Sequence, residues 1–240
     1  MSGAGIVLLL DLPPGDAWLD LAQVPSPGGV LGIGGVPAGL HRLGVDHVMP
    51  VSTWVHVRPG LVATKRFDGG MLLDAKGFRV AQLQGMAMAG EMRLVPFPAD
   101  QNAGWAELTG PLGTVLPALG RSDAPDLRSV VARAHDGDGE RFAAELAWAY
   151  LAAHLDGEPE AHRRWVQLVV ALGLTRGVEP AGWLERAYAL LGVQLERLGP
   201  RALREGTDLG DAARAALAAA DAFGGDVAGA AAKLRGLLAA

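Results

Sequence analysis

The spacing of hydrophobic residues changes near residue 120 of the chain. Before this point, short apolar runs alternate with segments rich in proline and glycine. The runs lie at residues 6–12, 30–36, 40–45, 54–57, 61–67, 71–73 and 78–83. Runs of this length between turn residues are typical of strands in antiparallel sandwiches and barrels. The first part of the chain therefore predicts an antiparallel β-sandwich or barrel-like domain, which we assign to residues 1–112.

Three turn signals define the predicted strand connections. Residues 13–15 (Pro-Pro-Gly) end the first strand, because proline cannot donate a backbone hydrogen bond to a sheet. Residues 58–60 (Arg-Pro-Gly) and 68–70 (Asp-Gly-Gly) each separate two apolar runs. Residues 58–60 therefore predict a β-hairpin, and residues 68–70 predict a turn into the next apolar run.

Beyond residue 120, apolar residues recur every three or four positions, which is the period of an amphipathic helix. The pattern predicts helices over residues 124–134, 141–155, 162–172, 181–198, 209–223 and 227–238. Short connections between helices favour antiparallel neighbours. We therefore predict an α+β protein, in which the β-rich domain is followed by an all-α helical array at residues 120–240.

Composition and charge narrow the possible functions. The chain contains no cysteine, which excludes disulfides, thiolate nucleophiles and thiolate metal sites. Its formal charge is −5 and its basic residues are scattered, so we expect no direct binding of nucleic acid. No segment approaches the roughly 20 apolar residues that cross a bilayer, so we expect no membrane association and a cytoplasmic location. The abundance of Ala, Gly and Arg indicates a GC-rich and hence bacterial gene.

Two motifs resemble ligand-binding loops but lack a required residue. The glycine-rich run at 28–35 is followed by Pro37, at the position where a dinucleotide-binding fingerprint requires glycine or alanine. We therefore predict a glycine-rich edge strand or loop. Residues 136–140 resemble the start of a calcium loop, but its last ligand falls at Ala147. We instead predict a helix-capping loop there.

Three histidines, His41, His47 and His56, lie close together in the predicted β domain. Three imidazoles can hold a catalytic metal, so a metal-dependent enzyme or small-ligand site remains an alternative interpretation. His56 alternates with Trp54 along its strand, and the other two flank turns, so nothing forces the three to converge. No Gly-x-Ser-x-Gly or His-Glu-x-x-His motif is present, and we predict no catalytic residues and no cofactor.

Aromatic residues are the best candidates for contacts with other proteins. We predict a partner surface at Trp18, His41 and Trp54, and contacts between the two domains at Phe97, Trp105 and Trp165. The segment His162-Arg163-Arg164-Trp165 could also form a basic patch. On a helix, however, Trp165 shares a face with Leu168, Val169 and Leu172, so we assign Trp165 to the buried face and both arginines to a solvated one.

Several segments, in chain order, resemble the Aar-two family, also called the cistron splicing factor family. They are residues 5–15, 35–41, 53–67, 94–98 with Trp105 and Leu108-Thr109, the positions Glu145, Leu146, Ala149, Leu155, Glu160, Ala161 and Trp165, and Gln194-Leu195. The long linker that eukaryotic members carry between their domains is nearly absent from this chain.

The resemblance implies a β-rich domain followed by a helical domain, and a role without catalysis. Members of the family are assembly chaperones that bind a core spliceosomal protein, in part through its RNase-H-like domain, and block premature binding of a helicase. A bacterial homologue would have no spliceosome to assemble. The resemblance therefore implies a protein-binding function with a partner that it does not identify.

Overall fold

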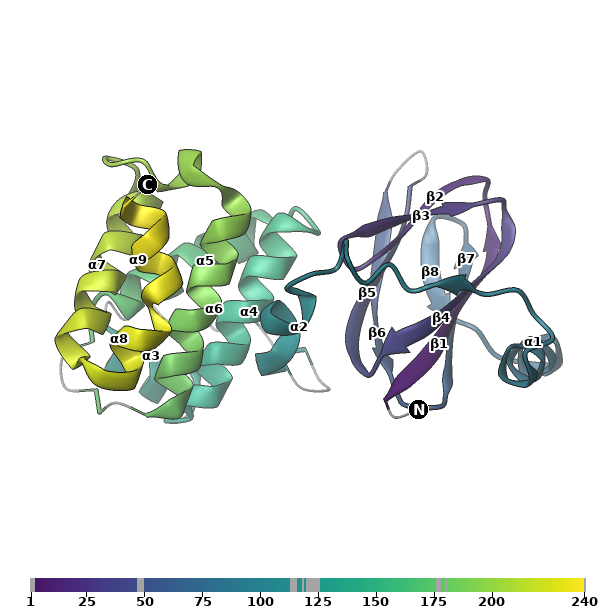
Figure 1. Ribbon diagram of the computed structural model, residues 1–240, viewed down its shortest axis with the longest axis horizontal. Coiled ribbons are helices and arrows are strands. Elements are labelled where there is room, and N and C mark those ends of the chain that lie inside the picture. The colour runs from purple at the N-terminus through teal and green to yellow at the C-terminus, as the bar shows by residue number, and fades with distance from the viewer. Residues whose placement is uncertain are drawn as a thin grey trace. The chain divides into compact units, whose positions relative to one another are not determined.

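The computed structural model describes residues 3–46, 50–112, 116–117, 119, 126–175, 178–179 and 181–239. The chain forms two compact units, Met1–Trp105 and Ala106–Ala240 (Figure 1). The first consists mainly of strands and the second of helices, which confirms the predicted α+β class. Residues 106–112, which we assigned to the β domain from the sequence, group with the helical unit.

The β unit is a sandwich of two sheets. Its strands are β1 (Ala4–Leu12), β2 (Gly15–Leu19), β3 (Ala22–Ser26), β4 (Gly29–Pro37), β5 (Gly39–Val45), β6 (Val51–Val57), β7 (Val62–Asp68), β8 (Met71–Asp74) and β9 (Val95–Pro96). One sheet has the order β8-β7-β1-β4-β9, and the other the order β3-β2-β5-β6. No strand was predicted at β2 and β3, because the apolar runs identified from the sequence do not include residues 16–29.

The strand pairing differs from the prediction in two respects. The hairpin predicted at residues 58–60 is wrong, since the chain there crosses from β6 in one sheet to β7 in the other. The sandwich is also not purely antiparallel, because β7 and β9 run parallel to their neighbours β1 and β4. The turn predicted at residues 68–70 is present: Gly69 and Gly70 adopt positive φ between the antiparallel strands β7 and β8.

Residues 78–83, predicted as a strand, begin the helix α1 (Phe78–Ala89). The buried positions Val80 and Ala87 are seven residues apart, and the partly buried Leu83 lies between them, which is a helical spacing. The six-residue run considered from the sequence was too short to reveal this period. The helix packs on Leu8 and Leu10 of β1, on the side of the five-stranded sheet that faces away from the sandwich core.

The core of the sandwich lies between the two sheets. Alternate residues of each strand point into it, among them Val7 and Leu9 of β1 and Leu43 and Val45 of β5. The residues between these positions therefore point to the outer faces. This alternation decides which candidate residues of the β unit can reach a surface.

The glycine-rich run lies in β4 between β1 and β9, so it is a strand but not a free edge. A methyl group added at Gly32 would lie 2.6 Å from the side chain of Leu94, and one at Gly34 would lie 3.0 Å from it. The glycines therefore make room for Leu94 to cross the sheet, which explains them without a phosphate ligand.

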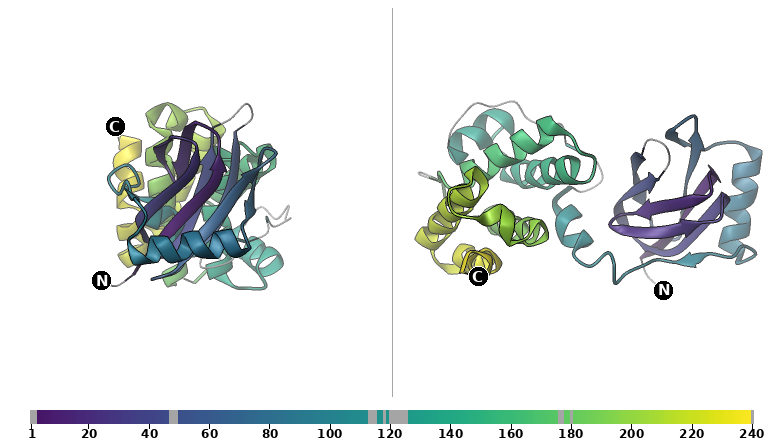
Figure 2. Two further views of the ribbon diagram at one scale, coloured as in Figure 1. Left: turned by 90° about the vertical axis from the view of Figure 1, so that its right-hand side faces the viewer. Right: turned by 90° about the horizontal axis from the view of Figure 1, so that it is seen from above.

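The helical unit follows the predicted segments closely. Its elements are α2 (Trp105–Thr109), which begins at the last residue of the β unit, the 3-10 turn η1 (Gly110–Leu112), α3 (Leu127–Ala134), α4 (Gly139–His154), α5 (Pro159–Leu172), α6 (Gly182–Leu198), η2 (Pro200–Leu203), α7 (Asp208–Phe223), α8 (Gly225–Ala230) and α9 (Ala232–Ala239). Figure 2 shows them as a bundle of packed helices. The helix predicted at 227–238 is divided in two at Ala231.

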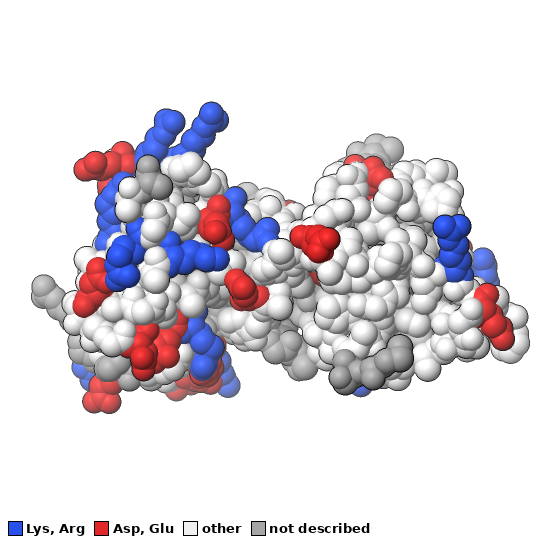
Figure 3. All heavy atoms as spheres, in the orientation of Figure 1, with Lys and Arg blue, Asp and Glu red and all other residues white. Residues whose placement is uncertain are grey.

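The loop between α3 and α4 caps a helix, as the sequence predicts. Asp136 and Gly137 adopt positive φ, and the carboxylate of Asp138 accepts a hydrogen bond from the backbone N–H of Glu140. On the face drawn in Figure 3, charged side chains are sparse over the β unit and frequent over the helical unit. Within the described part of the chain, no helix combines the length and apolar character needed to cross a membrane.

Candidate functional site: a buried polar network and a tryptophan face

A tight turn between β2 and β3 places a carboxylate inside the β unit. Leu19 pairs with Ala22, so only Asp20 and Leu21 form the turn, and Asp20 adopts φ of 60°. Aspartate tolerates this left-handed backbone better than most residues. Asp20 is 1% exposed, and its Oδ1 accepts a hydrogen bond of 2.9 Å from the backbone N–H of Arg42 on β5.

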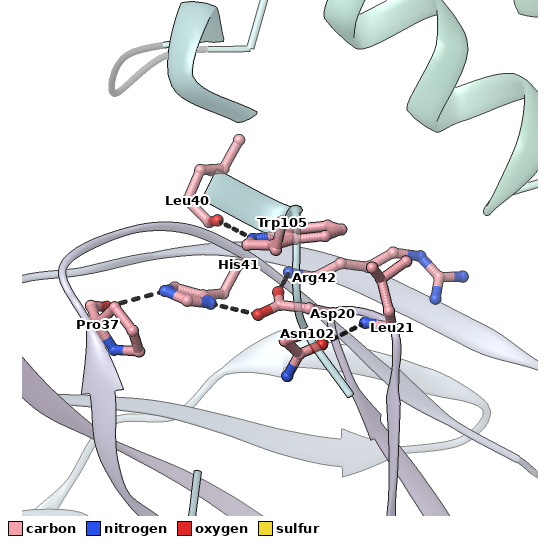
Figure 4. A network of polar contacts seen from close by, with 8 residues as sticks. All are labelled: Asp20, Leu21, Pro37, Leu40, His41, Arg42, Asn102 and Trp105. Atoms are coloured by element: carbon pink, nitrogen blue, oxygen red, sulfur yellow. Dashed lines mark hydrogen bonds and ion pairs between the residues drawn. The ribbon is translucent and has the colours of Figure 1, made fainter. Parts of the chain in front are cut away.

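The same carboxylate binds His41, which is 2% exposed (Figure 4). Nδ1 of His41 lies 2.7 Å from Oδ2 of Asp20, and its Nε2 lies 2.8 Å from the carbonyl oxygen of Pro37. A carbonyl oxygen only accepts hydrogen bonds, so Nε2 carries a proton. Both ring nitrogens are thus engaged, which leaves His41 no lone pair for a metal ion or for proton abstraction from a substrate.

Burial raises the pKa of the Asp20 carboxyl, and its hydrogen bonds to His41 and Arg42 only partly offset this effect. A carboxyl and an imidazole that share one proton carry no net charge as a pair. Such a pair can be buried when every polar atom has a partner. The arrangement is therefore a structural lock between the β2–β3 turn and β5.

Two further hydrogen bonds of the network, made by Asn102 and Trp105, hold the segment at the end of the β unit. Oδ1 of Asn102 accepts a hydrogen bond of 2.9 Å from the backbone N–H of Leu21, in the same turn as Asp20. Nε1 of Trp105 donates a hydrogen bond of 2.9 Å to the carbonyl oxygen of Leu40, next to His41. Figure 4 shows both contacts beside the Asp20–His41 pair. The end of the β unit is therefore fixed to its four-stranded sheet at two points.

The outer face of the four-stranded sheet carries two tryptophans. Trp18 pairs with Gly44 and Trp54 pairs with Arg42, so both indoles lie on the face opposite the core residue Leu43. We call this surface the tryptophan face. It comprises Trp18, Gln23, Arg42, Ser52, Trp54 and His56, all partly or fully exposed.

Gly44 makes room for a cation between the strands of this face. A methyl group added there would lie 3.7 Å from Nη1 of Arg42 and 3.3 Å from Cβ of Trp18. The guanidinium of Arg42 therefore lies over Gly44, on the same face of the sheet as Trp18. Tryptophan and arginine are the side chains most enriched where binding energy concentrates in protein interfaces.

The predicted partner residues thus separate into two groups. Trp18 and Trp54 share the outer face, although Trp54 gives one side of its indole to Trp105. His41 lies on the inner face and is buried, so it has no surface to offer a partner, contrary to the sequence prediction. Strand alternation decides this outcome, and the sequence alone did not establish the register.

The three predicted interdomain residues lie in different places. Phe97 packs against the core of the β sandwich, and Trp105 stacks on Trp54 within the same unit. Trp165 is fully buried inside the helical unit, where its Nε1 donates a hydrogen bond of 2.8 Å to Oε1 of Gln194. Its assignment to the buried face of its helix is confirmed.

The helical unit contains a buried charged cluster that the sequence analysis missed. Arg164, which we assigned to a solvated face, is 5% exposed and donates two hydrogen bonds to Glu145, of 2.7 Å from Nε and 2.9 Å from Nη2. Nε2 of His135 lies 2.9 Å from Oε2 of the same carboxylate. The cluster joins α3, α4 and α5. Its charges are paired with one another, which is typical of a structural ion pair.

The alternative interpretation, a metal or small-ligand site, requires the predicted histidines to lie close together in space. His41 pairs with Val55 and Leu40 pairs with His56, so the imidazoles of His41 and His56 lie on opposite faces of the sheet. His47 lies outside the described residues. Among the residues that the structure does describe, no group of three or more His, Asp or Glu side chains could hold a metal ion.

Comparison with known proteins adds no assignment. No protein-family model matches the chain, and no curated protein matches it either.

Proposed function

We propose that this protein is a non-enzymatic, cytoplasmic protein-binding protein, and that the tryptophan face of its β unit holds the partner. The observation that carries the proposal is that Trp18 and Arg42 share the outer face of the sheet, and that both lie close to Gly44. The resemblance to the Aar-two family of assembly chaperones supports the same class of function. We propose no counterpart of the splicing role itself.

The chemistry of the face favours a protein over a nucleic acid. Arg42 is the single cation among its six residues, whereas binding to a phosphate backbone needs several cations along the contact. Indoles bury a large apolar area at a low cost in side-chain entropy, and arginine forms directional contacts around them. A partner with an apolar centre and a carboxylate or carbonyl near Arg42 fits this surface.

The Asp20–His41 pair supports a structural role for the adjoining polar network. A catalytic histidine needs one nitrogen free to exchange a proton with the substrate. Both nitrogens of His41 are bound inside the sheet. The network instead fixes β2 relative to β5, and so holds Trp18 and Arg42 in their mutual arrangement.

Comparative capture from the organism that encodes the chain tests the proposal. The wild-type protein and the variants Trp18→Asp and Val170→Asp would be used as bait under identical conditions. Val170 is 40% exposed on the helical unit and serves as the matched surface control. We expect one protein to be recovered in stoichiometric amount with the wild type and the control, and to be lost with Trp18→Asp. Equal recovery with all three baits, or no stoichiometric protein with any of them, would contradict the proposal.

A further inference from the structure

The outward side of α1 carries no charged residue. Val80 and Ala87 on the inward side pack against the five-stranded sheet. The opposite side consists of Phe78, Ala81, Gln82, Gly85, Met88 and Ala89, all of which are exposed. A helix on a protein surface normally turns charged and polar residues to water. Figure 2 (left) looks onto this helix as it lies across the sheet.

Large apolar side chains concentrate on the same side of the β unit. Phe78 is 88% exposed and Met88 is 58% exposed. On β8, Leu72 points into the sandwich core, so its neighbours Met71 and Leu73 lie on the outer side together with α1, at 56% and 40% exposure. We call these residues, with the outward side of α1, the α1 patch. Several large apolar side chains exposed on one side of a unit are typical of an interaction site.

We infer that the α1 patch is the contact surface of a symmetric dimer, in which α1 packs antiparallel against α1 of a second copy and crosses it at Gly85. A two-fold interface places the same surface of both copies in contact. The proposed dimer is independent of the tryptophan face, which belongs to the other sheet.

The small residues of α1 are arranged symmetrically about the proposed crossing point. Ala81 and Ala89 lie four residues before and after Gly85. A methyl group added at Gly85 would meet no atom within 4 Å, so the backbone is open to close approach there. An antiparallel crossing at Gly85 sets Ala81 of each copy against Ala89 of the other. The side chains of Phe78 and Met88 then pack on either side of the crossing point.

The charges at the two ends of α1 select a second copy as the occupant. Lys76 and Arg79 lie at its N-terminal end, and Glu91 follows its C-terminal end, with Arg93 two residues further on. Arg79 approaches Asp11 only to 3.9 Å, and its side chain stays 75% exposed. In the antiparallel arrangement Arg79 of each copy meets Glu91 of the other, so the same attractive pair forms twice.

The size of the patch predicts a weak dimer. A helix of 12 residues is about 18 Å long, which limits the area that two such helices and the adjoining strands can bury. Interfaces at the small end of the range are typical of transient association. The dimer should therefore be detected as an equilibrium that depends on protein concentration.

Disulfide trapping tests the crossing point directly, because the chain has no cysteine of its own. Gly85→Cys places one thiol at the proposed axis, where the two Cα atoms would be close enough for a disulfide. Gly229→Cys in α8 is the matched control, since Gly229 is also exposed on a helix with no atom within 4 Å of an added methyl. We expect Gly85→Cys to form a covalent dimer much faster than Gly229→Cys under mild oxidation. Equal rates for the two variants would overturn the inference.

Sedimentation velocity over a range of concentrations provides the second test. Phe78→Glu should weaken dimerisation by about tenfold or more, because it buries a charge, whereas Val170→Glu on the helical unit should have no effect.

Arg79→Glu should weaken dimerisation roughly two- to tenfold, and the double variant Arg79→Glu/Glu91→Arg should restore it, since the charges of both ion pairs are then reversed. A wild-type protein that stays monomeric throughout, or a double variant no better than Arg79→Glu alone, would overturn the inference.

Discussion

The indole of Trp105 stacks on the indole of Trp54, with ring centroids 5.8 Å apart and ring planes inclined by 16°. Trp105 is the last residue of the β unit, whereas Trp54 lies in β6 on the outer face of the four-stranded sheet. The stack and the hydrogen bond from Trp105 to Leu40 together fix the point at which the chain leaves this unit. The sheet face that carries the proposed binding surface therefore also anchors the chain.

Removal of this anchor should destabilise the β unit. Trp105 is 4% exposed, so Trp105→Ala loses a buried aromatic ring, its stack and its hydrogen bond. We expect the free energy of unfolding to fall by about 3–5 kcal/mol, and Trp105→Phe, which keeps an aromatic ring, to cost less. Thermal and urea denaturation measure both effects. An unchanged melting temperature for Trp105→Ala would show that the stack does not anchor the chain.

The turn at Asp20 should tolerate asparagine better than alanine. Asp20→Ala removes the partners of His41 Nδ1 and of the Arg42 N–H, and it places alanine at φ of 60°. We expect a loss of about 2–4 kcal/mol from the free energy of unfolding. Asp20→Asn keeps an acceptor for the Arg42 N–H and a residue suited to this backbone, so it should lose less. Urea titration of both variants measures the difference, and equal losses would contradict the role given to the carboxylate.

The buried pair of Glu145 and Arg164 should behave as a unit. Arg164→Met leaves the Glu145 carboxylate buried without its main partner, and we expect a loss of about 3–5 kcal/mol in the free energy of unfolding. Replacing both residues by apolar ones, as in Glu145→Leu/Arg164→Met, should cost less than the single change. A double-mutant cycle by chemical denaturation measures the coupling. Costs that simply add would refute it.

Alkaline pH should weaken the helical unit through Tyr150. Burial raises the pKa of Tyr150 to about 12, although the positive charge of Arg197 partly opposes this. The unfolded chain releases the phenolic proton near pH 10, whereas the folded protein keeps it until about pH 12. The stability provided by the neutral tyrosine is therefore complete below pH 10 and is lost as the pH rises towards 12.

The expected loss over this interval is about 2 kcal/mol. Tyr150→Phe has no proton to release, so its free energy of unfolding should fall less steeply between pH 10 and pH 12. Burial raises the pKa of Tyr188 as well, so the variant should retain part of the slope. Denaturation at several alkaline pH values measures both slopes. Identical slopes for the wild type and Tyr150→Phe would contradict the assignment.

The helical unit could be predicted in detail because its helices are long and their apolar residues recur at a regular spacing. The predicted helix over residues 181–198 is observed at Gly182–Leu198. In contrast, β2 and β3 contain only five residues each, and β3 includes Pro25, so their alternation was not recognised. The period of α1 becomes visible only when residues beyond 83 are included.

The site could be predicted only in part, because it depends on which residues the fold brings together. Asp20 and His41 lie 21 positions apart, and their contact follows from the register between β2 and β5. Register likewise places His41 inside and Trp54 outside, a distinction that a list of aromatic residues does not contain. Arg164 was assigned to a solvated face because its neighbour Trp165 takes the buried face of the helix. The buried carboxylate that pairs with Arg164 belongs to Glu145, on a different helix.

Binding of a partner protein by the tryptophan face is best tested by the affinity of Trp18→Ala for the protein that the wild type captures. Isothermal titration calorimetry would compare this variant with the wild type and with Val170→Ala. We expect a dissociation constant about 30-fold higher or more for Trp18→Ala, as for a residue at the centre of an interface, and no change for Val170→Ala. Equal dissociation constants for all three proteins would contradict it.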